Sequence, residues 1–224
     1  MRSLIYTTGL LLAASPLLAQ GRMVDEGTLI VTRNGAPIGR EVFRIVRTPS
    51  ASGELYRATG IVSVGEQRIT PTLSADSSGT PVAYEVGVRA GTKWVLQLKA
   101  QTRPARFAVH ELTMSGDASR EYVVPNKYAV LDGDIFHQYY FVSLAGTSGS
   151  VAVIDPQGHA QVVATLQRSG SEQLDIGGKM LATTHFILVA GSAKREFWVD
   201  SEGRLLKVSI PDRGLLAVRD EPPR

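Results

Sequence analysis

Short apolar runs alternate with turn-forming residues along most of this chain. Val, Ile, Leu, Thr, Tyr and Phe recur in brief segments, which Gly, Pro, Asn, Asp and Ser separate. Within 40–46 the odd positions Glu41, Phe43 and Ile45 share one face of an extended strand, and the even positions share the other. A period of two residues between bounded turns is typical of half-buried β-strands, so the pattern predicts a chain built mainly from strands.

The same criterion gives the full set of predicted strands. They lie at 27–33, 40–46, 54–64, 67–75, 81–89, 93–101, 105–113, 119–124, 150–155, 160–168, 171–176, 179–190, 194–200, 204–210 and 214–219. Asn34-Gly35, Gly91-Thr92 and Gly177-Gly178 are typical of tight hairpin turns, which need positive φ angles. Connections this short favour antiparallel neighbours, because parallel strands need longer crossovers. The prediction is an antiparallel meander.

An Asp-x-x-Gly pattern occurs three times between predicted strands, beginning at Asp76, Asp155 and Asp200. Asp can start a turn by accepting a hydrogen bond from the backbone two residues further on, and Gly can close it in the left-handed conformation. Such fragments also occur in calcium loops, but these loops are too short and too poor in oxygen ligands for that role. We therefore interpret them as hairpin turns.

One segment has helical rather than strand periodicity. Over 131–146, five apolar positions fall largely on one helical face: Ile135, Phe136, Tyr139, Tyr140 and Val142. Asp132 or Asp134 can cap its start, and Gly146 suits its end. The segment can be an aromatic plug packed on the concave side of the sheet, or a lid over an apolar pocket. We favour the plug, because aromatic side chains dominate core burial.

The first nineteen residues have the layout of a secretory signal peptide. Arg2 supplies the positive start, the stretch 4–14 is apolar, and 17–19 ends in a small residue. A membrane anchor would need about 20 apolar residues, and Thr7, Thr8 and Gly9 interrupt this run. We expect cleavage after Ala19. Residues 20–219 should then form a single antiparallel β domain in the periplasm or outside the cell. No transmembrane span is expected after cleavage.

Composition narrows the class of protein. Removing residues 1–19 from the 224 leaves 205, enough for one domain with a real core. The chain has no cysteine, which excludes disulfides, thiol nucleophiles and thiolate metal sites, and favours a bacterial exported protein over a small animal extracellular module. The formal charge of +3 becomes +2 without Arg2, and the charges are scattered. We expect no nucleic-acid partner, since that needs a clustered basic face.

No catalytic, metal or cofactor motif stands out. None of the four histidines shares a metal-ligand spacing with another suitable residue, and "GTSGS" at 146–150 is a flexible loop rather than a nucleophile elbow. His137 lies three residues after Asp134 on the predicted helix. A hydrolase would need Asp132, Asp134 or His137 to meet another titratable group in a cleft. We predict no cofactor and no enzyme activity.

Both ends of the predicted domain resemble known sequences. The segment 195–221, with Trp198-Val199-Asp200 leading through Gly203 into 204–208, resembles the closing hairpin of several poorly characterised bacterial secreted families of unknown function. The segment 27–45 looks like the opening hairpin of the same group. Such families are similar in architecture to periplasmic lipoprotein carriers. The resemblance implies a half-barrel whose concavity can hold an acyl chain, and it implies no catalytic residues.

The sequence therefore predicts an all-β, mainly antiparallel fold. We expect a large curved meander sheet or half-barrel with one short helix on its concave face, and a disordered tail at 220–224. The leading hypothesis is an exported non-enzymatic protein that binds a lipid, an acyl chain or an envelope component in this concavity. The alternative is an envelope scaffold or protein-interaction module with a filled core. The residues expected to line the cavity are Trp94, Phe136, Tyr139, Tyr140 and Trp198.

Overall fold

The computed structural model describes residues 21–51 and 53–224. The predicted signal peptide at 1–19 lies outside these residues. The elements in chain order are β1 (Arg22–Arg33), β2 (Ala36–Ser50), β3 (Gly53–Val64), β4 (Gln67–Asp76), β5 (Pro81–Ala90), β6 (Lys93–Arg103), β7 (Arg106–Thr113), β8 (Gly116–Val123), β9 (Tyr128–Val130), α1 (Tyr139–Leu144), β10 (Gly149–Asp155), β11 (Ala160–Ile176), β12 (Lys179–Ala190), β13 (Ala193–Val199), β14 (Leu205–Ile210), the 3-10 helix η1 (Pro211–Arg213) and β15 (Leu215–Arg219).

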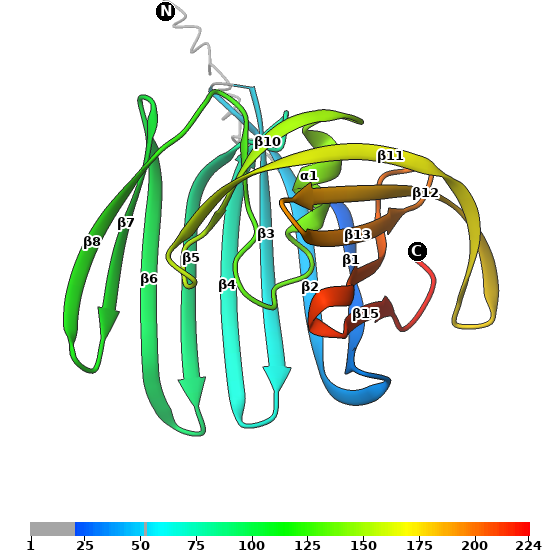
Figure 1. The fold of residues 1–224 in the computed structure, drawn as a ribbon, viewed down its shortest axis with the longest axis horizontal. Helices are drawn as coiled ribbons and strands as arrows, with labels where there is room; N and C mark the ends of the chain where they lie inside the picture. Colours follow the sequence, from blue (N-terminus) through cyan, green and yellow to red (C-terminus); the bar gives the residue numbers. More distant parts are fainter. Residues whose placement is uncertain (1–20, 52) are drawn as a thin grey trace, which may run out of the picture.

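All the described strands belong to one sheet, in the order β8-β7-β6-β5-β4-β3-β2-β1-β15-β14-β13-β12-β11-β10-β9 (Figure 1). Every neighbouring pair is antiparallel except β9 and β10, which run parallel. The all-β, mainly antiparallel prediction is confirmed. The meander is interrupted where β1 pairs with β15, since this pairing joins the two ends of the domain.

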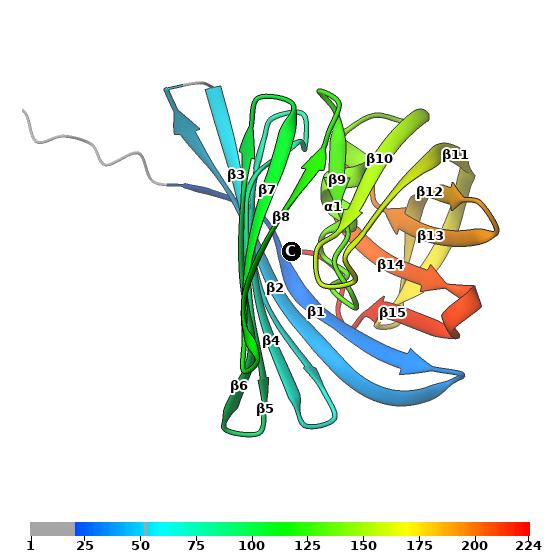
Figure 2. The same ribbon diagram turned by 60° about the vertical axis from the view of Figure 1, so that its left-hand side comes forward.

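The sheet curls without closing into a barrel. In Figure 2 the strands β2–β8 form one wall, β10–β15 form the opposite wall, and α1 lies between them. The β9 edge approaches the first wall, where the Tyr128 hydroxyl donates to the carbonyl oxygen of Pro81 at 3.0 Å. We call the face of the sheet that packs on α1 the inner face and the opposite one the outer face.

Strand alternation places the core on the inner face. In β2, Glu41, Phe43 and Ile45 are buried, whereas Val42 and Arg44 are exposed, as the period of two predicts. The long curved sheet alone leaves its inner face open to water. Burial of that face therefore depends on the segment between β9 and β10, which crosses the concavity and includes α1 (Figures 1 and 2).

Most turn predictions are confirmed, but at the turn that begins at Asp155 it is His159 and not Gly158 that has a positive φ, of 54°, and the Asp155 carboxylate accepts from the N–H group three residues on. Asn34 and Gly35 have φ angles of 50° and 80°, as the first hairpin turn requires. The Asp76 carboxylate accepts hydrogen bonds from the backbone N–H groups of Ser78 and Thr80, at 2.9 and 3.0 Å. Asp200 makes the same pattern with the N–H groups two and four residues on. These aspartates therefore build turns.

Three boundaries differ from the prediction. The segments 160–168 and 171–176 are one bent strand, β11, which continues through a bulge between Arg168 and Gly170. The strand β9 was not predicted. The helix predicted at 131–146 is only Tyr139–Leu144, because the backbone before it bonds to side chains of the sheet instead of starting a helix.

The structure also places the C-terminal tail, for which the sequence suggested disorder. The Asp220 N–H donates to the carbonyl oxygen of Thr28 at 2.9 Å, and the Arg204 guanidinium donates to the carbonyl oxygen of Arg224 at 2.7 Å. Among the described residues, no helix is long and apolar enough to cross a membrane.

Candidate functional site

The aromatic segment fills the concavity instead of covering a space. Phe136, Tyr139 and Tyr140 are each at most 3% exposed. The Tyr139 ring lies 5.6 Å from that of Phe197 on one wall, and the Tyr140 ring lies 6.2 Å from that of Tyr56 on the other. Burial raises the pKa of both tyrosines. The structure thus brings three of the five predicted site residues together as a plug, which we define as residues 131–144.

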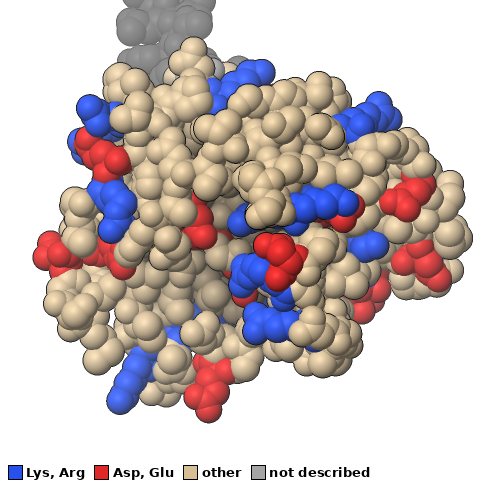
Figure 3. All heavy atoms as spheres, in the orientation of Figure 1, with Lys and Arg blue, Asp and Glu red and all other residues tan. Residues whose placement is uncertain are grey.

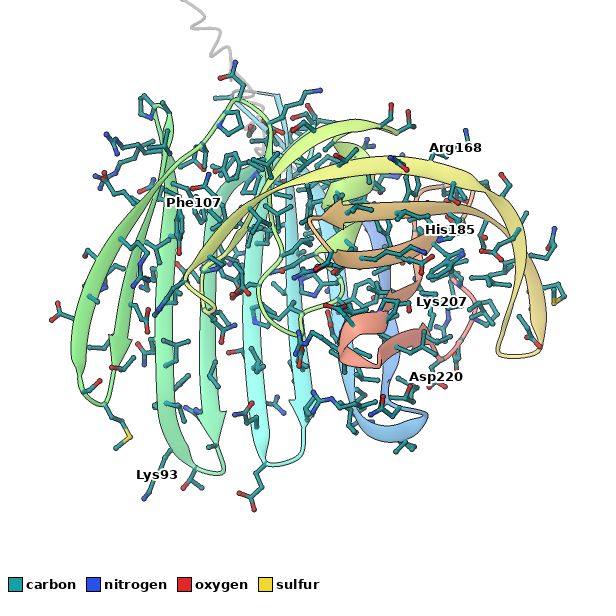
Figure 4. All side chains as sticks on the ribbon, in the orientation of Figure 1. Lys93, Phe107, Arg168, His185, Lys207 and Asp220 are labelled. Atoms are coloured by element: carbon teal, nitrogen blue, oxygen red, sulfur yellow. The ribbon has the colours of Figure 1, made fainter. Side chains whose placement is uncertain are left out.

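Trp198 lies away from this plug, on the outer face of β13. Its neighbour Phe197 takes the inward position, so strand alternation turns Trp198 outward. The indole stacks on His185 with centroids 4.3 Å apart, and the Lys207 ammonium lies 4.2 Å from its ring centroid. His185 and Lys207 are labelled in Figure 4 on the strands that flank β13. Trp198 is only 5% exposed, so it stabilises this wall and does not line the concavity.

Trp94 also lies on the outer face, at the opposite side of the sheet. The register of β5 and β6 shifts between Val88 and Arg89, which pairs Trp94 with Arg89. This irregularity turns the Trp94 side chain to the outer face of the sheet, the face on which Gly87 and Arg89 of β5 also lie. Lys93, labelled in Figure 4, marks the β5–β6 hairpin end beside it. Trp94 is 43% exposed, in contrast to the other four predicted site residues.

Two buried acidic groups anchor the plug to the sheet. The Glu41 carboxylate on β2 accepts hydrogen bonds from the backbone N–H groups of Phe136 and His137, and from the His137 imidazole. The His137 ring stacks on Phe43 with centroids 6.0 Å apart and lies directly above Gly60. A Cβ at position 60 would be 2.9 Å from the imidazole, so this close approach requires glycine. The inner face of the sheet and the plug therefore have complementary shapes and hydrogen-bonding groups at this point.

The second anchor is centred on Asp132. Its carboxylate accepts hydrogen bonds from the Tyr84 hydroxyl and from the backbone and side-chain nitrogens of Gln157, the latter two at 2.8 Å. Burial raises the pKa of Asp132 to about 7, and a hydrogen bond with Asp155 adds to the rise. Asp132 does not cap a helix, because Gln138 precedes α1 and accepts from the Asp132 N–H.

The hydrolase hypothesis required a cleft at Asp132, Asp134 or His137. Asp132 and His137 do meet titratable partners, but both are fully buried, and their partners hold the plug in place. Asp134 pairs with Arg213 at 2.6 Å and with Arg33 at 3.8 Å, away from both anchors. The arrangement attaches the segment to the sheet, and it gives acceptors to the backbone N–H groups of Asp132, Phe136 and His137.

Sequence reasoning missed Glu41 and Tyr84 as partners of the plug. Glu41 had a detectable signal, because it shares a strand face with Phe43 and Ile45, and a carboxylate on an apolar face needs a buried partner. Its partner lies 96 residues away in the sequence, which only the fold can reveal.

A hollow lined by exposed side chains lies on the outer face of β4–β8. Strand register sets out rows of outward residues across β4, β5 and β6: Thr70, Gly87 and Gln97 form one row, and Thr72, Glu85 and Lys99 form the next. Together with Trp94 these residues line a pocket of about 250 Å³. Gly87 has no side chain, so it leaves the floor of this pocket low.

A second pocket of about 600 Å³ continues from the first across β5–β8. Glu85 and Lys99 line both pockets, so the two adjoin at this pair of residues, and we call them together the outer groove. Small side chains leave room in its second half: Ala83, Ala108 and Ser119. Arg103, His110 and Glu121 add charged and polar groups. A third pocket, of about 340 Å³, lies between β1, β2 and the C-terminal tail. None of the three pockets is lined by Phe136, Tyr139 or Tyr140.

On the face of the molecule seen in Figure 3, Lys and Arg are interspersed with Asp and Glu and do not collect into one basic surface. Within the described residues, no cluster of three or more His, Asp or Glu side chains is arranged to hold a metal ion.

Comparison with known proteins supports the fold and leaves the activity open. No protein-family model matches the chain, and no curated protein matches it. A beta-barrel-like protein of the domain of unknown function DUF1849, from Brucella abortus, superposes with a TM-score of 0.54 at 9% identity and covers 90% of this chain and 98% of its own. This likeness shows a shared β-barrel-like fold.

A DUF1089 family protein from Pseudomonas aeruginosa superposes over 95% of this chain and 98% of its own at 14% identity. Its TM-score of 0.43 is too low to support a conclusion about this chain. Neither structure is described as a lipoprotein carrier. The resemblance to poorly characterised bacterial β-rich proteins therefore holds at the level of fold, and the likeness to lipoprotein carriers stays a prediction.

Proposed function

We propose that this chain is an exported, non-catalytic binding protein of the bacterial envelope that contacts its ligand through the outer groove. The proposal keeps the filled-core alternative from the sequence analysis and replaces the concave site by one on the other face of the sheet. The main observation that supports the proposal is the position of the plug. Phe136, Tyr139 and Tyr140 occupy the space in which an acyl chain would have to lie.

Opening that space would be costly. An internal ligand would have to displace aromatic side chains that are each buried, and replacing such a side chain by Ala in a core costs about 3–5 kcal/mol. The displaced segment would also leave Glu41 and Tyr84 buried on the sheet without their partners. The two anchors thus favour a permanent plug over a mobile lid.

The outer groove supplies what the concavity lacks. It is a hollow with one exposed aromatic platform, Trp94, and a set of polar side chains that point out of the sheet. Ligand sites commonly combine apolar contact area with a few placed polar groups. The strands beneath the groove are hydrogen-bonded on both sides from β4 to β7, which gives these side chains a rigid support.

Export is tested first. The full chain with a C-terminal tag is expressed in a Gram-negative bacterium, and the cells are fractionated. We expect the tagged protein in the periplasm or medium, beginning at Gln20 by mass spectrometry. Retention in the cytoplasm with an intact N-terminus would contradict export.

Binding is tested by co-sedimentation with separated envelope fractions: cell-wall material, lipid vesicles and soluble periplasmic components. The variant Trp94→Ala removes the platform. The matched control Met114→Ala removes a side chain that is 82% exposed and lies outside the groove. We expect one fraction to retain the wild type and the control but not Trp94→Ala. Equal behaviour of all three proteins would refute the proposal, as would a stoichiometric lipid extracted from the core.

A further inference from the structure

We infer that the ligand of the outer groove is a saccharide chain, and that Trp94 is the surface on which one sugar ring stacks. This inference rests on the proposed function, because it names the ligand class of the same groove. Its starting point is the way the indole is held.

Trp94 is fixed as one wall of the groove. The Arg89 guanidinium lies 4.0 Å from the indole centroid, and Arg89 does not line the pocket that the indole lines. The guanidinium therefore backs one face of the ring and leaves the other to the groove. At its edge the ring reaches over Gly87, where a Cβ would lie only 2.7 Å from the indole Cζ3 atom. The Arg89 guanidinium behind the ring and the Gly87 backbone beneath it hold the exposed indole of Trp94 in one orientation.

The side chains in front of this wall suit hydroxyl groups. Thr70 and Thr72 carry hydroxyls that both donate and accept, Gln97 carries an amide that does the same, and Glu85 and Lys99 supply an acceptor and a donor. A sugar ring has an apolar C–H face and a rim of hydroxyls that donate and accept. The apolar face of the sugar can stack on the indole. The hydroxyls of the sugar can hydrogen-bond to the polar side chains in front of the indole, which both donate and accept.

The length of the groove favours a chain over a single sugar. The first pocket, of about 250 Å³, is lined by Trp94, and the adjoining second pocket has a volume of about 600 Å³. Polar side chains of the second pocket include Gln101, Ser119 and Glu121. Further sugar units can therefore follow the stacked one across β6 to β8.

Other ligand classes fit these residues less well. An acyl chain needs a lining free of charges, whereas Glu85, Lys99 and Arg103 stand in the groove. A nucleic acid needs a clustered basic surface, and here Glu85 and Glu121 stand among Lys99 and Arg103. An extended peptide commonly adds to a free sheet edge, whereas the groove lies mainly across β4–β7, which are paired on both sides, and only reaches the edge strand β8 at its end.

The inference is tested by titrating the purified full chain with soluble saccharides: N-acetylglucosamine oligomers of increasing length, glucose oligomers and lipid-free core oligosaccharide. Parallel titrations use phosphatidylglycerol vesicles and a short DNA duplex. Binding is followed by calorimetry and by tryptophan fluorescence. The chain has two tryptophans, of which Trp198 is 5% and Trp94 is 43% exposed, so a quench by added ligand reports on Trp94.

We expect one saccharide series to bind more tightly as its length increases. Trp94→Ala should weaken this binding by roughly tenfold or more, as loss of an aromatic hot spot does, and Met114→Ala should not change it. Gly87→Val, which keeps residue 94 a tryptophan but pushes the indole out of its position over the backbone, should weaken binding as well. Circular dichroism confirms that each variant is folded.

The outcomes separate the inference from the function on which it rests. If Trp94-dependent binding is found only with vesicles, DNA or an envelope protein, the saccharide assignment is wrong and the outer groove remains the binding surface. If the folded wild type shows no Trp94-dependent binding to any fraction or titrant, both are wrong.

Discussion

The Asp132 anchor makes the stability of this protein depend on pH, and Asp132→Asn should abolish that part of the dependence. Asp132 is fully buried, and its pKa is about 7, compared with 3.8 for an ordinary aspartate. Between these two values the folded protein keeps a proton that the unfolded chain releases. The free energy of unfolding must therefore fall as pH rises from about 4 to about 7 and change no further above that range on account of this group.

The size of the effect follows from the same values. A pKa that rises from 3.8 to about 7 corresponds to about 4 kcal/mol at 1.36 kcal/mol per pH unit. This is a large share of the 5–15 kcal/mol that typically stabilises a domain. An asparagine at 132 mimics the protonated acid: it can accept from the Tyr84 hydroxyl and the Gln157 N–H, and its amide can donate to Asp155.

The assay is urea unfolding at pH 5 and pH 8, followed by circular dichroism. Because only the part of the range from pH 5 to about 7 lies inside this window, we expect the wild type to lose about 2–3 kcal/mol and Asp132→Asn to lose that much less. The control Asp117→Asn removes the same charge from a side chain that is 72% exposed, and it should behave as the wild type does. Equal pH dependence in wild type and Asp132→Asn would refute the reasoning, because the buried carboxyl would then not hold the extra proton.

Three further changes test the fit between plug and sheet, each by urea unfolding at pH 7. Phe136→Ala should cost about 3–5 kcal/mol, since it leaves a cavity in the core; a loss below 1 kcal/mol would mean that the plug is not packed. Glu41→Ala should cost more than Glu41→Gln, because only alanine leaves both backbone N–H groups of the plug without an acceptor; equal costs would contradict that role. Gly60→Ala should destabilise the protein by forcing His137 away, because its Cβ would lie 2.9 Å from the imidazole; unchanged stability would contradict this close approach.

Because the concavity is filled, the described part of this fold leaves no internal space there for a ligand, and a binding surface must lie elsewhere on the sheet. A curled sheet suggests an internal site, but here the inner face is satisfied by the chain itself through Glu41, Asp132 and the aromatic side chains between them. The outer face is left to carry a binding surface. Whether a curled sheet of this kind holds a ligand inside therefore depends on the segment that crosses it, and not on the sheet.

Local patterns in the sequence predicted much of the fold. The alternation in 40–46 fixed which face of β2 is buried, and Asn34-Gly35 fixed a hairpin turn, because both depend on residues that are neighbours along the chain. The aromatic spacing in 131–146 predicted a plug correctly. The start of its helix was wrong, because Glu41 takes the N–H groups of Phe136 and His137 that a helix cap would have taken.

The sites depended on contacts that no local pattern contains. Trp94, Phe136 and Trp198 are all large aromatics in apolar segments, and the sequence placed them in one cavity. A shift of register turned Trp94 to the outer face, alternation turned Trp198 outward on another wall, and only Phe136 entered the plug. The sequence by itself determined strands, turns and the aromatic plug, because these follow from spacing along the chain. Only the tertiary structure decided which face each aromatic occupies and that the concavity is full, because register and pairing join residues far apart in the chain.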